Sequence, residues 1–378
     1  MIYFDNSATT KIYPESLDSY VAVSKQYFGN PSSLHELGTV SSKLLEQSRK
    51  QIAAELSVKP EEIFFTSGGS EGDNWVIKGT AYEKSFYGKH IITTKIEHPA
   101  VLNTMRQLEK EGFEVTYLNV NDQGIVDLEE LKNSLRKDTI LVSIIAVNNE
   151  IGAVQPIKQI GNLLSDYPTI HFHIDAVQAH YVDILLGKES RVDMAVFSSH
   201  KFHGPRGVGF VYVREGKNLT PLIQGGGQEA DARSGTENLP AITAMAKSYR
   251  LHRGKIKEAP LQQMTDKIRE HISKFEDVVI FSPEDASSHI LCFGIKNVRG
   301  EVTVHAFEKD DIYLSTTSAC SSKSNKDSST LIAMGIPHNV AETAVRVSLS
   351  TENTMEEVDK FLEIFERVYD EFEIVRNS

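Results

Sequence analysis

Cysteine is scarce in this chain, whose 378 residues contain only Cys292 and Cys320. Two cysteines cannot build the disulfide framework of a small secreted protein, and their low number is in keeping with a reducing cytoplasm. No apolar stretch approaches the roughly 20 residues needed to span a bilayer. Residues 1–6 lack the basic region and the long apolar core of a signal peptide. We therefore expect a cytoplasmic protein without a membrane segment.

Positive charge is also in the minority, with 40 Lys and Arg against 52 Asp and Glu and a net charge of −12. Backbone binding of nucleic acid needs a basic field, so direct nucleic-acid binding is not expected as the main function. Hydrophobic residues make up 40% and charged residues 24%, an ordinary globular balance. No internal repeat is present, and the length suggests about two domains.

Apolar strand-like runs alternate with helical patterns through most of the chain. Strands that are apolar throughout and alternate with helices predict an α/β fold, with a mostly parallel sheet covered by helices. We predict a large domain over residues 12–257 and a smaller α+β domain formed by residues 1–11 and 258–378. Strands are expected at residues 63–66, 90–94, 113–118, 139–147, 170–174, 192–197, 208–213 and 288–295, and helices at about residues 14–28, 36–56, 70–86, 99–111, 156–167, 239–253, 261–275 and 356–372.

Ligands of open α/β sheets bind at the carboxyl ends of the strands, so the residues that follow each strand are the candidates for a site. Residues 66–74, Thr-Ser-Gly-Gly-Ser-Glu-Gly-Asp-Asn, follow the first strand and open a helix. Glycines permit close backbone approach, and a helix N-terminus offers free N–H groups to an anion. This segment predicts a phosphate site, although an ordinary helix start fits it equally well.

The next strand ends carry polar side chains of several kinds. His98 follows residues 90–94, and its ring could stack on an aromatic ligand and move protons, or could simply cap a helix. Asn149 follows residues 139–147. Asp175 and Gln178 follow residues 170–174. A buried carboxylate such as that of Asp175 needs a cationic partner, either in a structural salt bridge or as the protonated ring nitrogen of a cofactor.

Lys201 follows the strand at residues 192–197, in the segment Ser-Ser-His-Lys-Phe-His-Gly-Pro-Arg-Gly-Val-Gly at residues 198–209. The local pattern alone also fits a surface turn. Together with the other strand ends, it predicts a site for pyridoxal phosphate. The helix start and hydroxyls would hold the phosphate, Asp175 the ring nitrogen, and the amine of Lys201 the aldehyde.

The chain resembles the pyridoxal-phosphate-dependent cysteine desulfurases of the NifS/IscS type, in the class V aminotransferase group of the fold-type-I superfamily. The resemblance covers nearly the whole chain, with the motifs in the family's order. They are Asp-Asn-Ser-Ala-Thr-Thr at residues 5–10, Phe-Gly-Asn-Pro-Ser-Ser at 28–33, the helix start at 66–74, Glu-His at 97–98, Val-Asn-Asn-Glu-Ile-Gly at 147–152, His-Ile-Asp-Ala-Val-Gln at 173–178, Ser-Ser-His-Lys at 198–201, Arg-Ser-Gly-Thr at 233–236, Ser-Ala-Cys-Ser at 318–321 and Arg-Val-Ser-Leu at 346–349.

This resemblance implies a role for each matching residue. Lys201 would link covalently to the cofactor aldehyde, His98 would stack on its ring and transfer protons, and Asp175 would pair with its ring nitrogen. Gln178 and Asn149 would lie near the ring hydroxyl. The phosphate would be held by four residues of this chain: Gly69, Ser70, Ser198 and His200.

The resemblance also implies residues that act on the substrate and between subunits. Arg346 would clamp the carboxylate of L-cysteine, with Asn149 beside it. Thr236 would reach the phosphate of the other subunit, which implies a homodimer. Gly69 and Ser70 stand where many relatives have Ala-Thr, and the hydroxyl is kept. No metal site is predicted.

Cys320 distinguishes the desulfurases from ordinary aminotransferases. It lies in a long run of small and polar residues that predicts a mobile surface loop, where a thiol can ionise and attack. Cys292 lies in an apolar strand and is expected to be a core residue. The expected reaction converts L-cysteine into L-alanine and a persulfide on Cys320, whose sulfur passes to an acceptor protein.

The acceptor could be an iron–sulfur scaffold or a tRNA-thiolation enzyme. Selenocysteine lyase and another class V activity remain enzymatic alternatives. A non-catalytic homologue is a further alternative, but it would be expected to lack Lys201 or Cys320, and both are present.

Overall fold

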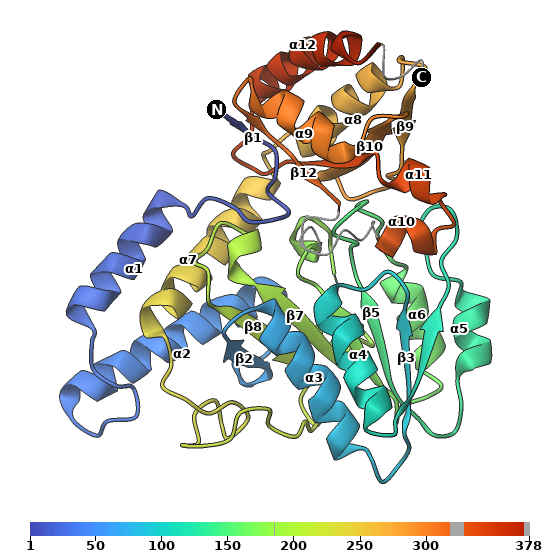
Figure 1. Cartoon of the computed structure of the whole chain (residues 1–378). Helices are drawn as coiled ribbons and strands as arrows, with labels where there is room; N and C mark the ends of the chain where they lie inside the picture. Colours follow the sequence, from blue (N-terminus) through green and yellow to red (C-terminus); the bar gives the residue numbers. More distant parts are fainter. Residues whose placement is uncertain (185, 318–328, 374–378) are drawn as a thin grey trace.

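A seven-stranded sheet forms the centre of the computed structural model, which describes residues 1–184, 186–317 and 329–373 (Figure 1). Strand β8 runs antiparallel to both of its neighbours, and the remaining pairs in the sheet are parallel. The predicted α/β class is therefore confirmed. In spatial order the strands are β2 (Ile63–Thr66), β8 (Gly209–Val213), β7 (Met194–Ser198), β6 (His171–Asp175), β5 (Thr139–Ile145), β3 (His90–Thr94) and β4 (Glu114–Leu118).

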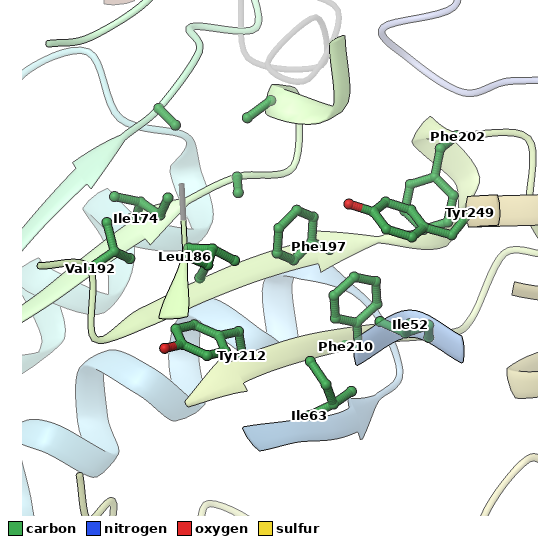
Figure 2. Packing of buried hydrophobic residues seen from close by; sticks show 14 of the residues in the cluster. Ile52, Ile63, Ile174, Leu186, Val192, Phe197, Phe202, Phe210, Tyr212 and Tyr249 are labelled. Carbon is green, nitrogen blue, oxygen red and sulfur yellow. The ribbon is translucent and has the colours of Figure 1, made fainter. Parts of the chain in front are cut away.

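Helices cover both faces of this sheet, because the strands carry buried apolar side chains on each side. On one face lie α3 (Gly69–Glu83) and α4 (Pro99–Lys110). The other face packs against α2 (Glu36–Leu56), α5 (Leu128–Ser134), α6 (Ile157–Leu164) and α7 (Leu239–Ile256). Figure 2 shows part of this second layer, where the rings of Phe197 and Phe210 stack with centroids 4.6 Å apart.

A second, four-stranded antiparallel sheet lies at the top of Figure 1. Its strands, in spatial order, are β12 (Ser315–Thr316), β13 (Ala344–Ser348), β10 (Ile290–Ile295) and β9 (Val278–Ile280). A separate apolar cluster joins it to helices α8 (Leu261–Ile272), α9 (Gly300–Glu308) and α12 (Met355–Glu371). The remaining elements are α1 (Pro14–Gln26), α10 (Ser329–Ala333), α11 (His338–Ala341) and the short 3-10 turns η1 (Pro60–Glu62), η2 (Ala179–Tyr181), η3 (Gly187–Glu189) and η4 (Ser199–Lys201).

The N-terminal segment pairs with the C-terminal part of the chain. Strand β1 (Ile2–Tyr3) runs parallel to β11 (Ile312–Tyr313), and Asp5 bridges to Ser348. The division into residues 12–257 and residues 1–11 with 258–378 stays a prediction. The helices that were predicted from the apolar pattern are present, with ends that differ by a few residues, as is usual where helix termini fray. Within the described ranges no helix is long and apolar enough to cross a bilayer.

Replacement of one core aromatic tests the packing of the second sheet. Phe293 in β10 is fully buried, and its ring meets that of Phe365 edge-on at 5.8 Å. We expect Phe293→Ala to lower the free energy of unfolding by about 3–5 kcal/mol, measured by urea denaturation. Phe86→Ala is the matched control, since Phe86 is 101% exposed, and it should change stability by less than about 0.5 kcal/mol. Equal effects of the two substitutions would contradict this assignment of the core.

Candidate active site

A cavity of about 600 Å³ lies at the carboxyl ends of the strands of the seven-stranded sheet. Ten of the residues predicted from the sequence line it: Gly69, Ser70, His98, Asn149, Asp175, Gln178, Ser198, His200, Lys201 and Arg346. Thr236 is exposed and does not line this cavity. Cys320 lies outside the described residues. These ten residues extend from Gly69 to Arg346 in the sequence, and the fold brings them together in one concave site.

The start of α3 is shaped to hold an anion. Its first residue, Gly69, follows Gly68, which has a φ of +151° and gives the helix no side-chain cap. A Cβ atom on Gly69 would come 2.8 Å from the Val177 side chain, so glycine allows the helix start to approach the strand ends closely. The uncapped N–H groups and the positive end of the helix dipole form a cradle suited to a phosphate.

Hydroxyl and imidazole groups extend this cradle. The Ser198 side chain lies beside Gly68 and Gly69. The imidazole Nδ1 of His200 lies 3.2 Å from the hydroxyl of Thr9. Burial lowers the pKa of His200 to about 4, and the positive charges of Lys201 and Arg206 contribute to this shift. His200 is therefore neutral near pH 7 and can serve as a hydrogen-bonding group without adding charge.

Lys201 is the last residue of η4, directly after β7. Its ammonium group donates to the carbonyl oxygens of Ser7, at 2.6 Å, and Ala8, at 3.0 Å. The side chain lines the cavity, which disfavours the interpretation of this lysine as an ordinary surface-turn residue. An amine held by two backbone carbonyls has a fixed position from which it can react with a bound carbonyl compound.

Asp175 ends β6 and is only 3% exposed. Its Oδ1 accepts a hydrogen bond of 2.9 Å from the backbone N–H of Val177. Burial raises the pKa of this carboxyl group, whereas the charges of His98 and Lys201 lower it. No arginine or lysine in the described part of the chain forms an ion pair with Asp175 within 4.0 Å. The alternative in which Asp175 serves a structural salt bridge therefore lacks a cationic partner among these residues.

His98 both caps a helix and lines the cavity. Its Nδ1 accepts a 3.1 Å hydrogen bond from the N–H of Ala100 and so caps α4, while the ring lines the cavity. Helix capping and a position in the cavity are therefore compatible for His98. Because Nδ1 is an acceptor, the neutral ring carries its proton on Nε2. Burial lowers the pKa of His98, with the charge of Lys201 acting in the same direction.

The cavity fits pyridoxal phosphate by the chemistry of its residues. A phosphate would occupy the cradle at the start of α3, and a protonated ring nitrogen would balance the carboxylate of Asp175. The amine of Lys201 is available for the aldehyde in the same cavity. The fit rests on the uncapped helix start and on a buried carboxylate without an arginine or lysine ion-pair partner in the described ranges.

Arg346 in β13 connects the second sheet to the cavity. Its Nη1 donates to the backbone carbonyl of Asn149 at 2.7 Å, and its Nη2 donates to Asp5 at 3.0 Å and to the Ser315 hydroxyl at 2.9 Å. The Nε atom is buried and has no partner among the described residues. This guanidinium is therefore held in one orientation and keeps a donor for an anionic group such as a carboxylate.

Several cavity residues were not singled out individually from the sequence. They include Ser7, Ala8 and Thr9 in the motif at residues 5–10, together with Asp73 and Arg206. The motif indicated that the N-terminal segment belongs to the family's pattern. Ser7 and Ala8 contact Lys201 through backbone carbonyls, however, which no side-chain pattern reveals. The Asp73 carboxyl group is 1% exposed, and its Oδ1 has no hydrogen-bond partner in the described ranges.

Glu97 lies at 2% exposure directly before His98, and burial raises its pKa to about 8. Its Oε1 accepts from the Thr94 hydroxyl at 2.7 Å and from the Ile145 N–H at 2.9 Å. The charge of Asp175 raises the pKa of Glu97 further, and both carboxylates raise the pKa of Asp73. The site therefore keeps Glu97 protonated near pH 7.

The effect of pH on Glu97→Gln tests this protonation state. The folded-state pKa lies above the unfolded value, so wild-type Glu97 destabilises the fold progressively as the pH rises from about 4.5 to about 8. Glutamine mimics the neutral acid and does not titrate, so the variant does not lose stability in this way as the pH rises. We expect the stability of Glu97→Gln relative to wild type to increase by up to about 1 kcal/mol per pH unit between pH 5.5 and 7.5, measured by urea unfolding. A pH-independent difference would contradict the raised pKa.

Comparison with known proteins identifies the family. The family model described as "Aminotransferase class-V" matches residues 2–361. A "NifS/IcsS protein homolog" of Lactobacillus delbrueckii subsp. bulgaricus is 53% identical over 98% of both chains. The "Cysteine desulfurase IscS" of Clostridium botulinum strain Hall is 41% identical over 97% of this chain and 94% of its own.

Two solved structures have the same fold. One, a "NIFS-LIKE PROTEIN", is 37% identical with a TM-score of 0.91 and 99% coverage of both chains. The other, "SspA in complex with cysteine", is 32% identical with a TM-score of 0.83 and covers 94% of this chain and all of its own. With the fold, the cavity and full-length similarity in agreement, the chain belongs to the class-V aminotransferase family, among the proteins of the NifS/IscS type.

Proposed function

We propose that this protein is a pyridoxal-phosphate-dependent cysteine desulfurase. The observation that carries the proposal is the convergence of the Lys201 amine, the Asp175 carboxyl group and the uncapped start of α3 on one cavity. Relatives with 41–53% identity over nearly the whole chain bear desulfurase or NifS-type names, and one similar structure is described as a complex with cysteine. L-cysteine is accordingly the proposed substrate.

The cofactor, when bound, would supply an electron sink next to the α-carbon of the substrate. The residues of this chain hold and orient the reactants. Gly69, Ser70, Ser198 and His200 would bind the phosphate, and Asp175 would keep the ring nitrogen protonated. Gln178 and Asn149, which line the same cavity, would hold the ring hydroxyl.

The remaining residues act on the substrate. Arg346 binds its carboxylate, Nζ of Lys201 removes the α-proton, and the Nε2 position of His98 exchanges protons with the sulfur and the leaving group.

The sulfur would be transferred to Cys320, which lies outside the described residues. The Cys320 thiolate attacks the sulfur of the substrate, so that an S–S bond forms and the C–S bond of the substrate breaks. Cys320 becomes a persulfide, and the three-carbon remainder takes up protons and leaves as L-alanine. The sulfur then passes to an acceptor protein, either an iron–sulfur scaffold or a tRNA-thiolation enzyme.

We also propose that the protein works in the cytoplasm as a homodimer. Thr236 supports this proposal, because the residue is exposed and lies outside the cavity lined by the other predicted cofactor-binding residues. It would act on the phosphate bound by the second subunit. The net charge of −12 disfavours direct binding of nucleic acid and is compatible with an acceptor that is a protein.

The reaction is tested by incubating the protein with L-cysteine and a thiol reductant and measuring sulfide and alanine, which should form in equal amounts. We expect Cys320→Ala to lower sulfide release by roughly 100-fold or more, since the nucleophile is lost. Cys292→Ala is the matched control. Cys292 is fully buried in β10 and burial raises its pKa, so the rate should stay within about twofold. A normal rate for Cys320→Ala would refute the persulfide role.

The cofactor link is tested separately by absorbance. The wild-type protein with pyridoxal phosphate should show the visible band of the covalently linked cofactor, and Lys201→Ala should lose it because the amine is absent. Lys11→Ala, which removes an exposed lysine, should keep the band. Retention of the band in Lys201→Ala would place the covalent link on another residue.

A further inference from the structure

A cluster of buried histidines contacts the cavity residue Gln178 and has no part in the reaction described above. His180 and His252 are hydrogen-bonded through Nδ1 and Nε2 at 2.9 Å, and the ring of His289 lies 5.5 Å from that of His180. All three rings are at most 3% exposed. They come from η2, from α7 and from the segment that enters β10, so the cluster joins the two sheets of the chain. One member, His289, also contacts a cavity residue.

His289 forms a hydrogen bond with Gln178. The distance between Nε2 of His289 and Oε1 of Gln178 is 3.3 Å, and an amide oxygen only accepts, so Nε2 carries the proton. The other ring nitrogen, Nδ1, then accepts from the hydroxyl of Ser287 at 2.7 Å. Burial and the charge of Arg346 lower the pKa of His289 to about 3. The ring is therefore neutral near pH 7, with a single tautomer set by its two neighbours.

The opposite side of the Gln178 amide is fixed as well. Its Nε2 donates to the carbonyl oxygen of Ser7 at 2.9 Å, and the same oxygen accepts from the Lys201 amine at 2.6 Å. A flipped amide would place two acceptors, Oε1 and the Ser7 carbonyl, against each other. Gln178 is 3% exposed and lines the cavity. In this orientation its second N–H remains for a group in the cavity.

We propose that His289 is a positioning residue that locks the amide of Gln178, so that Gln178 donates a hydrogen bond to an anionic oxygen of the bound cofactor. The chain of contacts runs from Ser287 through His289 to Gln178 and ends at the Ser7 carbonyl that also holds Lys201. This inference deepens the proposed function and rests on its cofactor site. It assigns a role in that site to a residue more than 100 positions from Gln178, on the segment that leads into the second sheet.

The test uses His289→Phe in the holoprotein, because phenylalanine keeps a ring of similar size and removes both nitrogens. Without the N–H donor, Oε1 of Gln178 is left unpaired and the amide is no longer fixed. We expect bound pyridoxal phosphate to dissociate about three- to tenfold faster, followed by loss of its visible absorbance. The pH midpoint of that absorbance should rise by about 0.5–1 unit, because a lost donor favours protonation of the ring oxygen.

Two further variants separate positioning from folding. His289→Gln restores an amide N–H near the position of Nε2 and should return the midpoint and the dissociation rate toward the wild-type values. His252→Phe is the matched control, since it removes a buried histidine of the same cluster whose hydrogen bond is to His180 and not to Gln178, and both readouts should stay at the wild-type values. If His289→Phe does not fold, Ser287→Ala removes the hydroxyl donor to Nδ1 and should shift both readouts in the same direction by a smaller amount.

If His289→Phe changes neither the rate of cofactor release nor the pH midpoint of the absorbance, the inference about His289 is wrong, and the proposed function is not affected. Equal changes in His289→Phe and His252→Phe would also overturn it, because they would reflect packing of the cluster. A wild-type protein that binds no pyridoxal phosphate would overturn the inference together with the proposed function.

Discussion

The buried carboxyl group of Asp175 is the constraint on which the site depends. Burial favours its neutral form, and the charges of His98 and Lys201 counter this preference only in part. A carboxylate in such a position becomes favourable when a cation binds against it. The charge of Asp175 is therefore coupled to the binding of any cationic group at the end of β6.

Three buried titratable groups near Asp175 have pKa values shifted toward their neutral forms. Burial raises the pKa of Glu97 to about 8, so this acid is largely neutral near pH 7, and burial also raises the pKa of Asp73 above its usual value. The pKa of His173, two residues before Asp175 on the same strand, is lowered to about 3 by burial, and its Nδ1 lies 2.9 Å from the Ser143 hydroxyl. Neutral polar groups can hold a ligand by hydrogen bonds without competing for the cation at Asp175.

The fold was largely predictable from the sequence, but the antiparallel direction of strand β8 was not. Apolar runs such as residues 139–147 indicated buried strands because no polar face is needed between two helical layers. The direction of β8 was not predicted, because the strand pattern of residues 208–213 is the same for either orientation. Its antiparallel pairing with β7 depends on how residues 199–208 turn back, with His203 at a φ of +61° and Gly207 at +77°.

The site was predictable where side chains follow strand ends, as for Lys201 and Asp175. It was not predictable where the contributing group belongs to the backbone. The carbonyl of Ser7 accepts from both Lys201 and Gln178, and its amide N–H donates to the Ser348 hydroxyl. No residue type signals such a role, since each amino acid carries the same peptide group.

The segment at residues 5–10 and the second sheet therefore control the cavity through hydrogen bonds to residues of the first sheet. Asp5 and Ser315 hold Arg346, which in turn donates to the carbonyl of Asn149. A change in the relative position of the two sheets would alter the orientation of the arginine and of Gln178 together. The guanidinium of Arg346 and the amide of Gln178 are thus both oriented by hydrogen bonds that join the two sheets.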